Sequence, residues 1–370
     1  MTRSFVISSA LLLALVSSNG CRDSASGPGN SSSLLYVKEL DTSASAGIVL
    51  DGNYVYFQTT DGVNPGKLYR ISKDGQDVTT YASGGQSFGV PTIKDSCIVT
   101  TSTTAGIRVF EKSSGQLRWA NLARDVLVLA TADENAVYIT EPNSVRAVSL
   151  AGGTTLWETV IIGKNVFNPV VDGEYIYFAT GGLHRQDGYL YCINKSTGSI
   201  VFRDTLPYME SRSQWGGSIA GVEVWQDYVL VPGDNWYFYC FNKNNGSMIW
   251  RFLADAPMET PPRVHDGKAF FGSLNQTCYG VDAATGASLW SYSAGGSIRR
   301  VPPSFHGGRV SFASGRLIIL DQSSGAKVVE LGRSNTGYYF FTAAFDSDGR
   351  VYCTGGEHGS ERQLFMAYQF

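Results

Sequence analysis

The side chains that most often catalyse reactions are sparse in this chain and match no catalytic motif. The four histidines are His184, His265, His306 and His358, and no G-x-S-x-G, H-E-x-x-H or phosphate-loop pattern occurs. Residues 346–349 (DSDG) begin like a calcium loop but lack the downstream Glu of an EF-hand, so a turn is the simpler interpretation. We expect no catalytic residue, no metal and no cofactor, although a paired-carboxylate site built from distant Asp and Glu stays open.

A second group of side chains suits binding. Arg, Trp, Tyr and Met gather in residues 181–188 and 207–216, and this composition is typical of protein-interaction hot spots. The residues that we expect to bind a partner are His184, Arg185, Arg212, Trp215, Trp236, Arg299 and Arg300. Two alternatives stay open. The rings can pack beneath their own loops, with the arginines solvated or paired with Glu210 and Glu259, and exposed Trp and Tyr also suit a carbohydrate.

These segments belong to a repeat of about forty residues that covers most of the chain. In each repeat a turn ending in Gly is followed, four residues later, by a large apolar residue or a smaller substitute. The glycines are Gly75, Gly115, Gly153, Gly198, Gly246, Gly286 and Gly325, and the residues that follow are Thr79, Trp119, Trp157, Phe202, Trp250, Trp290 and Val329. A fixed period of this length, built from strands, predicts the blades of a β-propeller.

A second series of turns sets the number of blades. Short turns rich in Asp and Gly precede aromatic or β-branched strands at eight places, as Asp51-Gly52 precedes residues 54–57. We assign them to the hairpins between strands A and B of eight four-stranded antiparallel blades, and the seven Gly turns to the C–D hairpins. The acceptors expected for turn amides, four residues before the Gly, are Glu111, Asn194, Asn242, Asp282 and Asp321.

Eight A–B turns and seven C–D turns leave one D strand to be found. Residues 34–40 (LLYVKEL) have the composition of a strand, and we expect them to pair with residues 363–370 and to close the ring without an open edge. Successive A–B turns are about forty residues apart, but Asp172 and Asp227 are 55 apart. The surplus falls in residues 181–188 and 207–216, on the face where B–C and D–A loops meet.

The N-terminal residues have the pattern of an export signal. Arg3, an apolar stretch over residues 5–16 and small residues precede Cys21, and the stretch is too short to span a bilayer. The pattern resembles a bacterial lipoprotein signal, which implies that residues 1–21 are a signal and that Cys21 is lipidated. Ser18 departs from the usual Leu, so ordinary cleavage is the alternative. Residues 22–33 are rich in Ser and Gly, and we expect a disordered tether before a propeller over residues 34–370.

Composition excludes one class of partner. The formal net charge is -3 and no Lys/Arg run occurs, so we expect no nucleic-acid binding. We also expect a monomer. The cysteines beyond Cys21 are odd in number and contain no C-x-x-C pair, and we interpret them as small buried strand residues.

Residues 281–290 (VDAATGASLW) resemble the tryptophan-docking repeat of the pyrroloquinoline-quinone-like propeller superfamily. The resemblance covers residues 34–370. It implies that Trp119, Trp157, Trp250 and Trp290 dock against the neighbouring blade, where their large rings are buried between sheets. The contacts at Thr79, Phe202 and Val329 are expected to be weaker.

Two branches of this superfamily imply different functions. Quinone-dependent alcohol dehydrogenases are longer, and many carry a disulfide between adjacent cysteines, whereas this chain has no Cys-Cys pair and no recognisable calcium or base set. The outer-membrane assembly lipoproteins of the BamB family resemble the chain in signal, tether, blade number and length. This second branch implies a non-enzymatic lipoprotein of the bacterial outer membrane that faces the periplasm and reaches the membrane through its lipid anchor alone. By the resemblance, its partners are a β-barrel assembly subunit or nascent outer-membrane proteins. A propeller lipoprotein that binds a glycan or small ligand is the alternative, and a dehydrogenase is the less favoured one.

Overall fold

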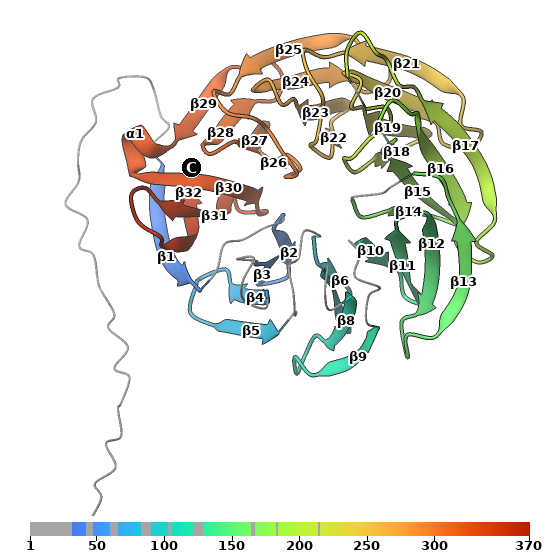
Figure 1. Cartoon of the computed structure of the whole chain (residues 1–370). Helices are drawn as coiled ribbons and strands as arrows, with labels where there is room; N and C mark the ends of the chain where they lie inside the picture. Colours follow the sequence, from blue (N-terminus) through green and yellow to red (C-terminus); the bar gives the residue numbers. More distant parts are fainter. Residues whose placement is uncertain are drawn as a thin grey trace, which may run out of the picture. The chain divides into compact units, whose positions relative to one another are not determined.

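The computed structural model describes residues 32–41, 47–59, 66–82, 90–102, 106–121, 129–163, 167–182, 184–213 and 215–370. Within these residues, eight antiparallel sheets of four strands follow one another around a ring (Figure 1). The prediction of an all-β, eight-bladed propeller is confirmed. The predicted signal peptide, Cys21 and most of the predicted tether lie outside the described residues.

The first four blades are meanders whose strands pair in sequence order from the inner to the outer edge. Blade 1 contains β2 (Val49–Asp51), β3 (Tyr54–Gln58), β4 (Lys67–Ser72) and β5 (Val78–Ala82). Blade 2 contains β6 (Thr92–Ile93), β7 (Cys97–Ser102), β8 (Gly106–Glu111) and β9 (Leu117–Asn121). Blade 3 contains β10 (Leu129–Ala132), β11 (Ala136–Glu141), β12 (Ser144–Ser149) and β13 (Thr155–Val160). Blade 4 contains β14 (Val170–Asp172), β15 (Tyr175–Thr180), β16 (Gly188–Asn194) and β17 (Ile200–Leu206).

The next three blades repeat the meander. Blade 5 contains β18 (Glu223–Trp225), β19 (Tyr228–Pro232), β20 (Tyr237–Asn242) and β21 (Met248–Leu253). Blade 6 contains β22 (Arg263–His265), β23 (Lys268–Gly272), β24 (Thr277–Asp282) and β25 (Ser288–Ser293). Blade 7 contains β26 (Ser304–His306), β27 (Arg309–Ala313), β28 (Leu317–Asp321) and β29 (Lys327–Leu331), and the short helix α1 (Arg333–Thr336) follows. Four of the five predicted acceptors receive turn amides, as at Asp321, whose Oδ1 accepts from the Ser323 and Ser324 amides. The Glu111 carboxylate instead accepts from the Ser113 hydroxyl and from Arg118.

Blade 8 takes its outermost strand from the beginning of the described chain. Its order is β30 (Tyr338–Phe345), β31 (Arg350–Glu357), β32 (Gln363–Gln369) and β1 (Ser33–Leu40), and β1 lies beside the red C-terminal strands in Figure 1. β1 runs antiparallel to β32, from Ser33 opposite Gln369 to Leu40 opposite Gln363. The predicted ring closure is confirmed. The strand begins at Ser33, so the last residue of the predicted tether belongs to the sheet.

Most neighbouring blades are joined by an aromatic side chain of strand D that covers the glycine of the next C–D turn. A Cβ on Gly153, for example, would lie 2.8 Å from the Trp119 ring, so only glycine allows this close approach. The pairs are Tyr36–Gly75, Tyr81–Gly115, Trp119–Gly153, Trp157–Gly198, Phe202–Gly246, Trp250–Gly286 and Trp290–Gly325. The four predicted docking tryptophans therefore dock as expected.

Blade 1 corrects one expectation. Thr79 does not cover the next glycine; Tyr81, two residues further on and on the same strand face, covers Gly115 instead. The C–D turns of blades 1 and 2 have the same length, but the glycine comes one residue earlier in blade 1, because the Gly75 amide donates to Ser72 O whereas the Gly115 amide donates to Glu111 O. The β4–β5 pairing also lacks the bulge that β8–β9 contains. The docking position therefore moves along the strand.

Ion pairs add a second contact at several blade interfaces. A Lys that follows strand C pairs with an Asp in the A–B turn of the preceding blade, as in Lys195–Asp133 at 3.2 Å and Lys243–Asp172 at 2.9 Å. Burial alone would raise the pKa of Asp133. Hydrogen bonds from the Asn135 and Ala136 amides, the Tyr138 hydroxyl and Lys195 outweigh it and lower this pKa below its ordinary value.

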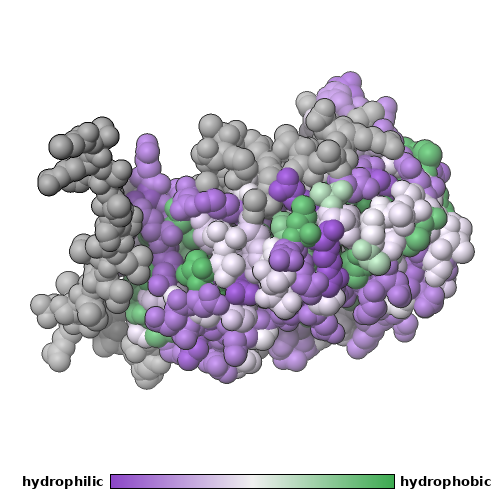
Figure 2. Space-filling view, turned by 90° about the horizontal axis from the view of Figure 1, so that it is seen from below, coloured by the Kyte–Doolittle hydropathy of each residue, from purple (hydrophilic) through white to green (hydrophobic). Residues whose placement is uncertain are grey.

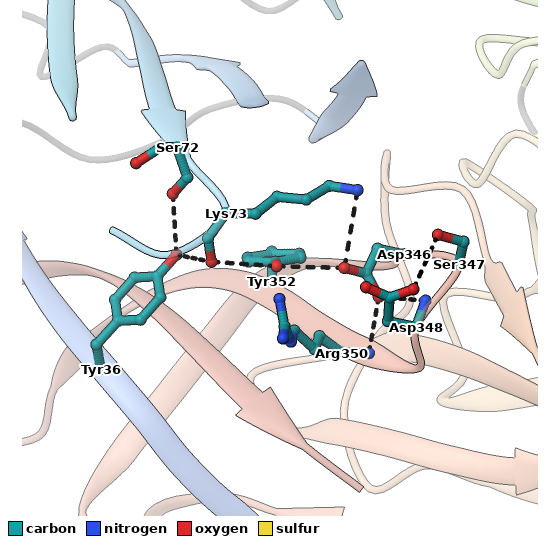
Figure 3. Close-up of polar contacts among 8 residues, drawn as sticks. All are labelled: Tyr36, Ser72, Lys73, Asp346, Ser347, Asp348, Arg350 and Tyr352. Atoms are coloured by element: carbon teal, nitrogen blue, oxygen red, sulfur yellow. Dashed lines mark hydrogen bonds and ion pairs between the residues drawn. The ribbon is translucent and has the colours of Figure 1, made fainter. Parts of the chain in front are cut away.

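The seam between blades 8 and 1 contains the same elements (Figure 3). The Tyr36 hydroxyl donates to Lys73 O at 3.2 Å, and the Lys73 Nζ lies 3.8 Å from Asp346 Oδ2. Asp346 Oδ1 accepts from the amides of Asp348 and Arg350, each at 2.9 Å. Residues 346–349 therefore form a turn that uses its own carboxylate, as interpreted from the sequence, and the turn is part of the ring closure.

The outer strands carry exposed apolar side chains. Those on the D strands include Val78, Leu117, Leu156, Val160, Ile200, Val201, Met248, Ile249, Leu253 and Leu289. Figure 2, which looks from the side of β5 and β9, shows hydrophobic residues in small patches separated by hydrophilic ones. On this side of the ring the apolar residues do not merge into one continuous surface.

Candidate functional site

The two long segments predicted to bind a partner meet on the B–C/D–A face of blades 4 and 5. Residues 181–187 join β15 to β16, and residues 207–222 join β17 to β18. Gly181 and Gly217 form an antiparallel bridge between them, and the Gly182 amide donates to Gly216 O at 3.0 Å. The extra length therefore forms one paired structure and not two separate loops.

Glycine makes this pairing possible, and we call Gly181, Gly182, Gly188, Gly216 and Gly217 the glycine clasp. Gly217 has a φ of 81°, in the left-handed region. A Cβ on Gly217 would overlap the Thr180 carbonyl oxygen, and a Cβ on Gly188 would overlap the same oxygen and the Gly217 Cα. A larger residue at either position would push the segments apart. The clasp therefore fixes the positions of the side chains that the two segments carry.

The clasp brings together three of the predicted binding residues. The rings of His184 and Trp215 lie 5.6 Å apart at 84°, an edge-to-face arrangement. The Trp215 side chain is still 48% exposed, which is unusual for so large an apolar group. Arg185 lies 3.6 Å from Glu210 with both side chains exposed, so the pairing with Glu210 that the sequence left open does occur. An exposed ion pair of this kind contributes little to stability.

Arg212 lies beside the clasp and is partly buried. Its guanidinium carbon is 5.7 Å from the centre of the Trp236 ring and 5.6 Å from that of Tyr237. These cation–π contacts hold the guanidinium against the loop between β19 and β20. The structure therefore places Arg212 and Trp236 next to each other, with part of the predicted binding surface used in packing.

Three predicted binding residues adopt a backbone that favours glycine. The φ angles are 60° for Arg185, 75° for Trp236 and 59° for Arg300. For a bulky residue such as Trp, a positive φ is an outlier, and such strain is concentrated at functional sites. Among the described residues, no hydrogen-bond partner reaches the buried Nε1 of Trp236. The loop that carries Trp236 is therefore held in an unfavourable conformation.

Arg299 and Arg300 lie on the connection between blades 6 and 7, and both are exposed. Arg299 forms a parallel bridge with Glu259, and the Arg300 amide donates to Glu259 O at 3.0 Å. The predicted residues thus form two groups, one around the glycine clasp and one between blades 6 and 7.

Asp234 lies between the two groups and was missed by sequence reasoning. Its amide donates to Gly217 O of the clasp at 2.9 Å, and its side chain is buried, with 6% of the residue exposed. Burial, and then the charge of Glu259, raise the pKa of Asp234 to about 8. The signal that could have found it is a comparison of blades, because the corresponding turn position of blade 6 is Leu274.

A cavity of about 810 Å³ lies along the ring axis between the innermost strands. Its wall is largely apolar and includes Ile48, Leu50, Val90 and Val170. The Asn168 side-chain amide crosses between blades and donates to Val90 O at 3.1 Å and to Ala130 O at 2.6 Å. A cavity of this size is in the range of small-molecule sites.

Reactive cysteines and membrane helices are not features of the described chain. The five cysteines in it are free and buried, and burial raises the pKa of Cys192 to about 11 and that of Cys240 to about 12. Thiols with such pKa values are poor nucleophiles. None of the helices in the described ranges has the length and apolar character needed to cross a bilayer.

Comparisons with known proteins agree with this architecture. The family model described as outer membrane protein assembly factor BamB matches residues 23–165, 141–218 and 209–359. The crystal structure of BamB from Moraxella catarrhalis superposes with a TM-score of 0.70 and 14% identity, covering 92% of this chain and 98% of that one. The quinohemoprotein alcohol dehydrogenase from Comamonas testosteroni superposes with a TM-score of 0.70 and 10% identity, covering 91% and 76%.

One curated relative points to an enzyme. Tetrathionate hydrolase from Acidithiobacillus ferrooxidans is 26% identical over 208 residues, which are 55% of this chain and 34% of that protein. The match thus covers about a third of the relative's length. At these identities the solved structures establish the propeller fold and leave the choice between scaffold and enzyme to the site itself.

Proposed function

The chain belongs to the family of the outer membrane protein assembly factor BamB, and we propose that it is a non-enzymatic scaffold that binds a polypeptide with the B–C/D–A face of blades 4–7. In the bacterial envelope, the partner is a β-barrel assembly subunit or a nascent outer-membrane protein. Lipidation at Cys21 anchors the protein to the outer membrane, with the propeller in the periplasm.

One observation carries this proposal: the glycine clasp holds an exposed Trp215 on a rigid loop pair. A free loop loses conformational entropy when it becomes ordered on binding, whereas a clasped loop is already ordered in the folded protein. Trp and Arg are the side chains that contribute most at protein interfaces. The pattern of Trp215, Arg212 and Arg300 around one face fits such an interface.

A glycan is the second candidate, and the exposed Trp215 ring beside His184 favours it. An aromatic face offers a sugar ring an apolar stacking surface, so the same residue serves either ligand. The two candidates differ in what else they need. A polypeptide covers a wide surface that includes Arg299 and Arg300, whereas a short oligosaccharide occupies only the surroundings of Trp215.

The test replaces Trp215 with Ala and measures capture of the β-barrel assembly subunit from detergent-solubilised membranes by the immobilised protein. We expect capture to weaken about thirtyfold, equivalent to about 2 kcal/mol, because a central Trp is lost from the interface. The melting temperature should stay nearly the same, because Trp215 lies outside the blade cores.

The matched control is Trp225→Ala on the opposite face, where Trp225 stacks on Tyr228 with ring centres 5.7 Å apart. This variant should capture the subunit as the unmodified protein does. Equal loss of capture and of stability in Trp215→Ala would make the residue structural. Unchanged capture combined with lost retention on immobilised oligosaccharide would favour the glycan candidate.

A further inference from the structure

Carboxylates that the fold buries elsewhere are supplied with donors. Asp133 receives two backbone amides and the Tyr138 hydroxyl and pairs with Lys195. Asp346 receives two amides and lies near Lys73. This pattern is general, because a buried carboxylate without donors is costly. Asp234 is the exception that needs an explanation.

Asp234 is enclosed to the same degree but has no donor. It is 6% exposed, and no described residue donates a hydrogen bond to its carboxyl group or forms an ion pair with it. The hydrogen bond from its backbone amide to Gly217 O places Asp234 beside the glycine clasp. Among the residues that the structure describes, the Asp234 carboxyl oxygens have no hydrogen-bond donor.

The charged groups around Asp234 do not satisfy it. Glu259, from the connection between blades 5 and 6, adds a second negative charge. Arg212, from the connection between blades 4 and 5, is placed over Trp236 and Tyr237. Arg299 and Arg300, from the connection between blades 6 and 7, are exposed. A cation with N–H donors that comes from outside the chain would supply the hydrogen bonds that these groups do not.

We propose that Asp234 forms a subsite that receives a guanidinium or ammonium group of the bound polypeptide. This inference rests on the proposed function and names the chemistry of one contact within it. A guanidinium suits the place well, because its planar N–H fork pairs with a carboxylate through two hydrogen bonds. The subsite adds charge recognition to the aromatic surface around Trp215.

Binding at this subsite is coupled to a proton. With its pKa near 8, the Asp234 carboxyl is neutral at pH 6 and largely ionised at pH 9. A bound cation favours the ionised form, so a proton leaves when binding occurs near pH 7. We expect the affinity for a cationic probe to rise at least tenfold from pH 6 to pH 9, and we expect no such rise after Asp234→Asn.

The experiment titrates the purified protein with N-acetyl-arginine amide and follows the indole N–H resonance of Trp236, assigned with Trp236→Phe. The control probe is N-acetyl-citrulline amide, which has the same shape without the charge. We expect a saturable shift with the arginine probe and at least tenfold weaker binding of the citrulline probe. Asp234→Asn should weaken arginine binding at least tenfold, and Asp227→Asn, at an exposed turn on the opposite face, should leave it unchanged.

Equal binding of the two probes, or unchanged arginine binding by Asp234→Asn, would overturn the subsite. The same resonance shift with calcium chloride alone would also overturn it. If Trp215→Ala loses subunit capture and no arginine effect exists, the inference fails and the proposed function stands. Arginine binding without any polypeptide capture would support the subsite and remove the proposed function.

Melting curves show whether Asp234→Asn folds. A folded-state pKa raised above the ordinary Asp value of 3.8 means that, between these two pKa values, the folded protein holds a proton that the unfolded chain has lost. The Asp234 contribution to stability is therefore present below about pH 4 and is lost as the pH rises toward 8. We expect Asp234→Asn to melt at a higher temperature than the unmodified protein at pH 8, with the difference shrinking toward pH 4.

Discussion

Replacing β1, Ser33–Leu40, with a Gly/Ser segment of the same length should open the ring and lower the melting temperature by about 10 °C or more, with aggregation. β1 supplies every hydrogen bond on the outer side of β32. It also supplies Tyr36, whose ring covers Gly75 and whose hydroxyl bonds to Lys73 O across the seam (Figure 3). Without it, β32 becomes an unprotected edge strand that can pair with another molecule. Thermal melting and size-exclusion chromatography measure both effects.

A graded pair of point variants separates the Tyr36 hydroxyl bond from the contact of its ring with Gly75. Tyr36→Phe keeps the ring over Gly75 and loses only the hydroxyl bond, so we expect a loss of about 1 kcal/mol. Tyr36→Ala removes the ring and should cost about 3 kcal/mol or more. A segment replacement that melts like the unmodified protein and stays monomeric would show that the ring does not depend on β1.

Gly217→Ala should reduce capture of the β-barrel assembly subunit about a hundredfold and leave the melting temperature of the ring nearly unchanged. An alanine at this position would have to adopt the left-handed backbone of Gly217, and its methyl group would overlap the Thr180 carbonyl oxygen. Together these effects cost about 3 kcal/mol in the clasp. If only the clasped form binds, the competent fraction falls by about a hundredfold. The capture assay used for Trp215→Ala measures this change.

Gly152→Ala is the matched control for the clasp. Gly152 lies in the C–D turn of blade 3 at a φ that is not positive, and an added Cβ has no atom within 4 Å. This variant should capture the subunit normally. Normal capture by Gly217→Ala as well would mean that the loops bind without a fixed conformation, which would remove the main physical support for the proposed interface.

The architecture was accessible from the sequence because its determinants are local. Turns that need a positive φ, such as the one at Gly153, recur at a fixed distance from a large aromatic residue. This repeat can be recognised in the sequence without knowing which residues are in contact. The exception at Thr79 shows the limit of the method. In blade 1 the glycine comes one residue earlier in its turn and the β4–β5 pair lacks the bulge, and Tyr81 takes the docking role. Only the pairing of the strands reveals this shift.

The candidate site was accessible only in part. Loop length and composition identified Trp215 and Arg212, because surplus residues in a regular repeat are visible as a change of spacing. Asp234 was not found, because it lies in a turn of ordinary length where an Asp is normally exposed. Its burial depends on contacts with the clasp and with the neighbouring blade, which come from distant parts of the chain.

The most direct test of the binding face is a comparison of two photo-crosslinking positions in living cells. A benzophenone amino acid replaces Trp215 in one variant and Trp225, on the opposite face, in the other. We expect irradiation to join position 215 to a β-barrel assembly subunit, identified by mass spectrometry, and to give no such product from position 225. A product from position 225 without one from position 215 would contradict the account.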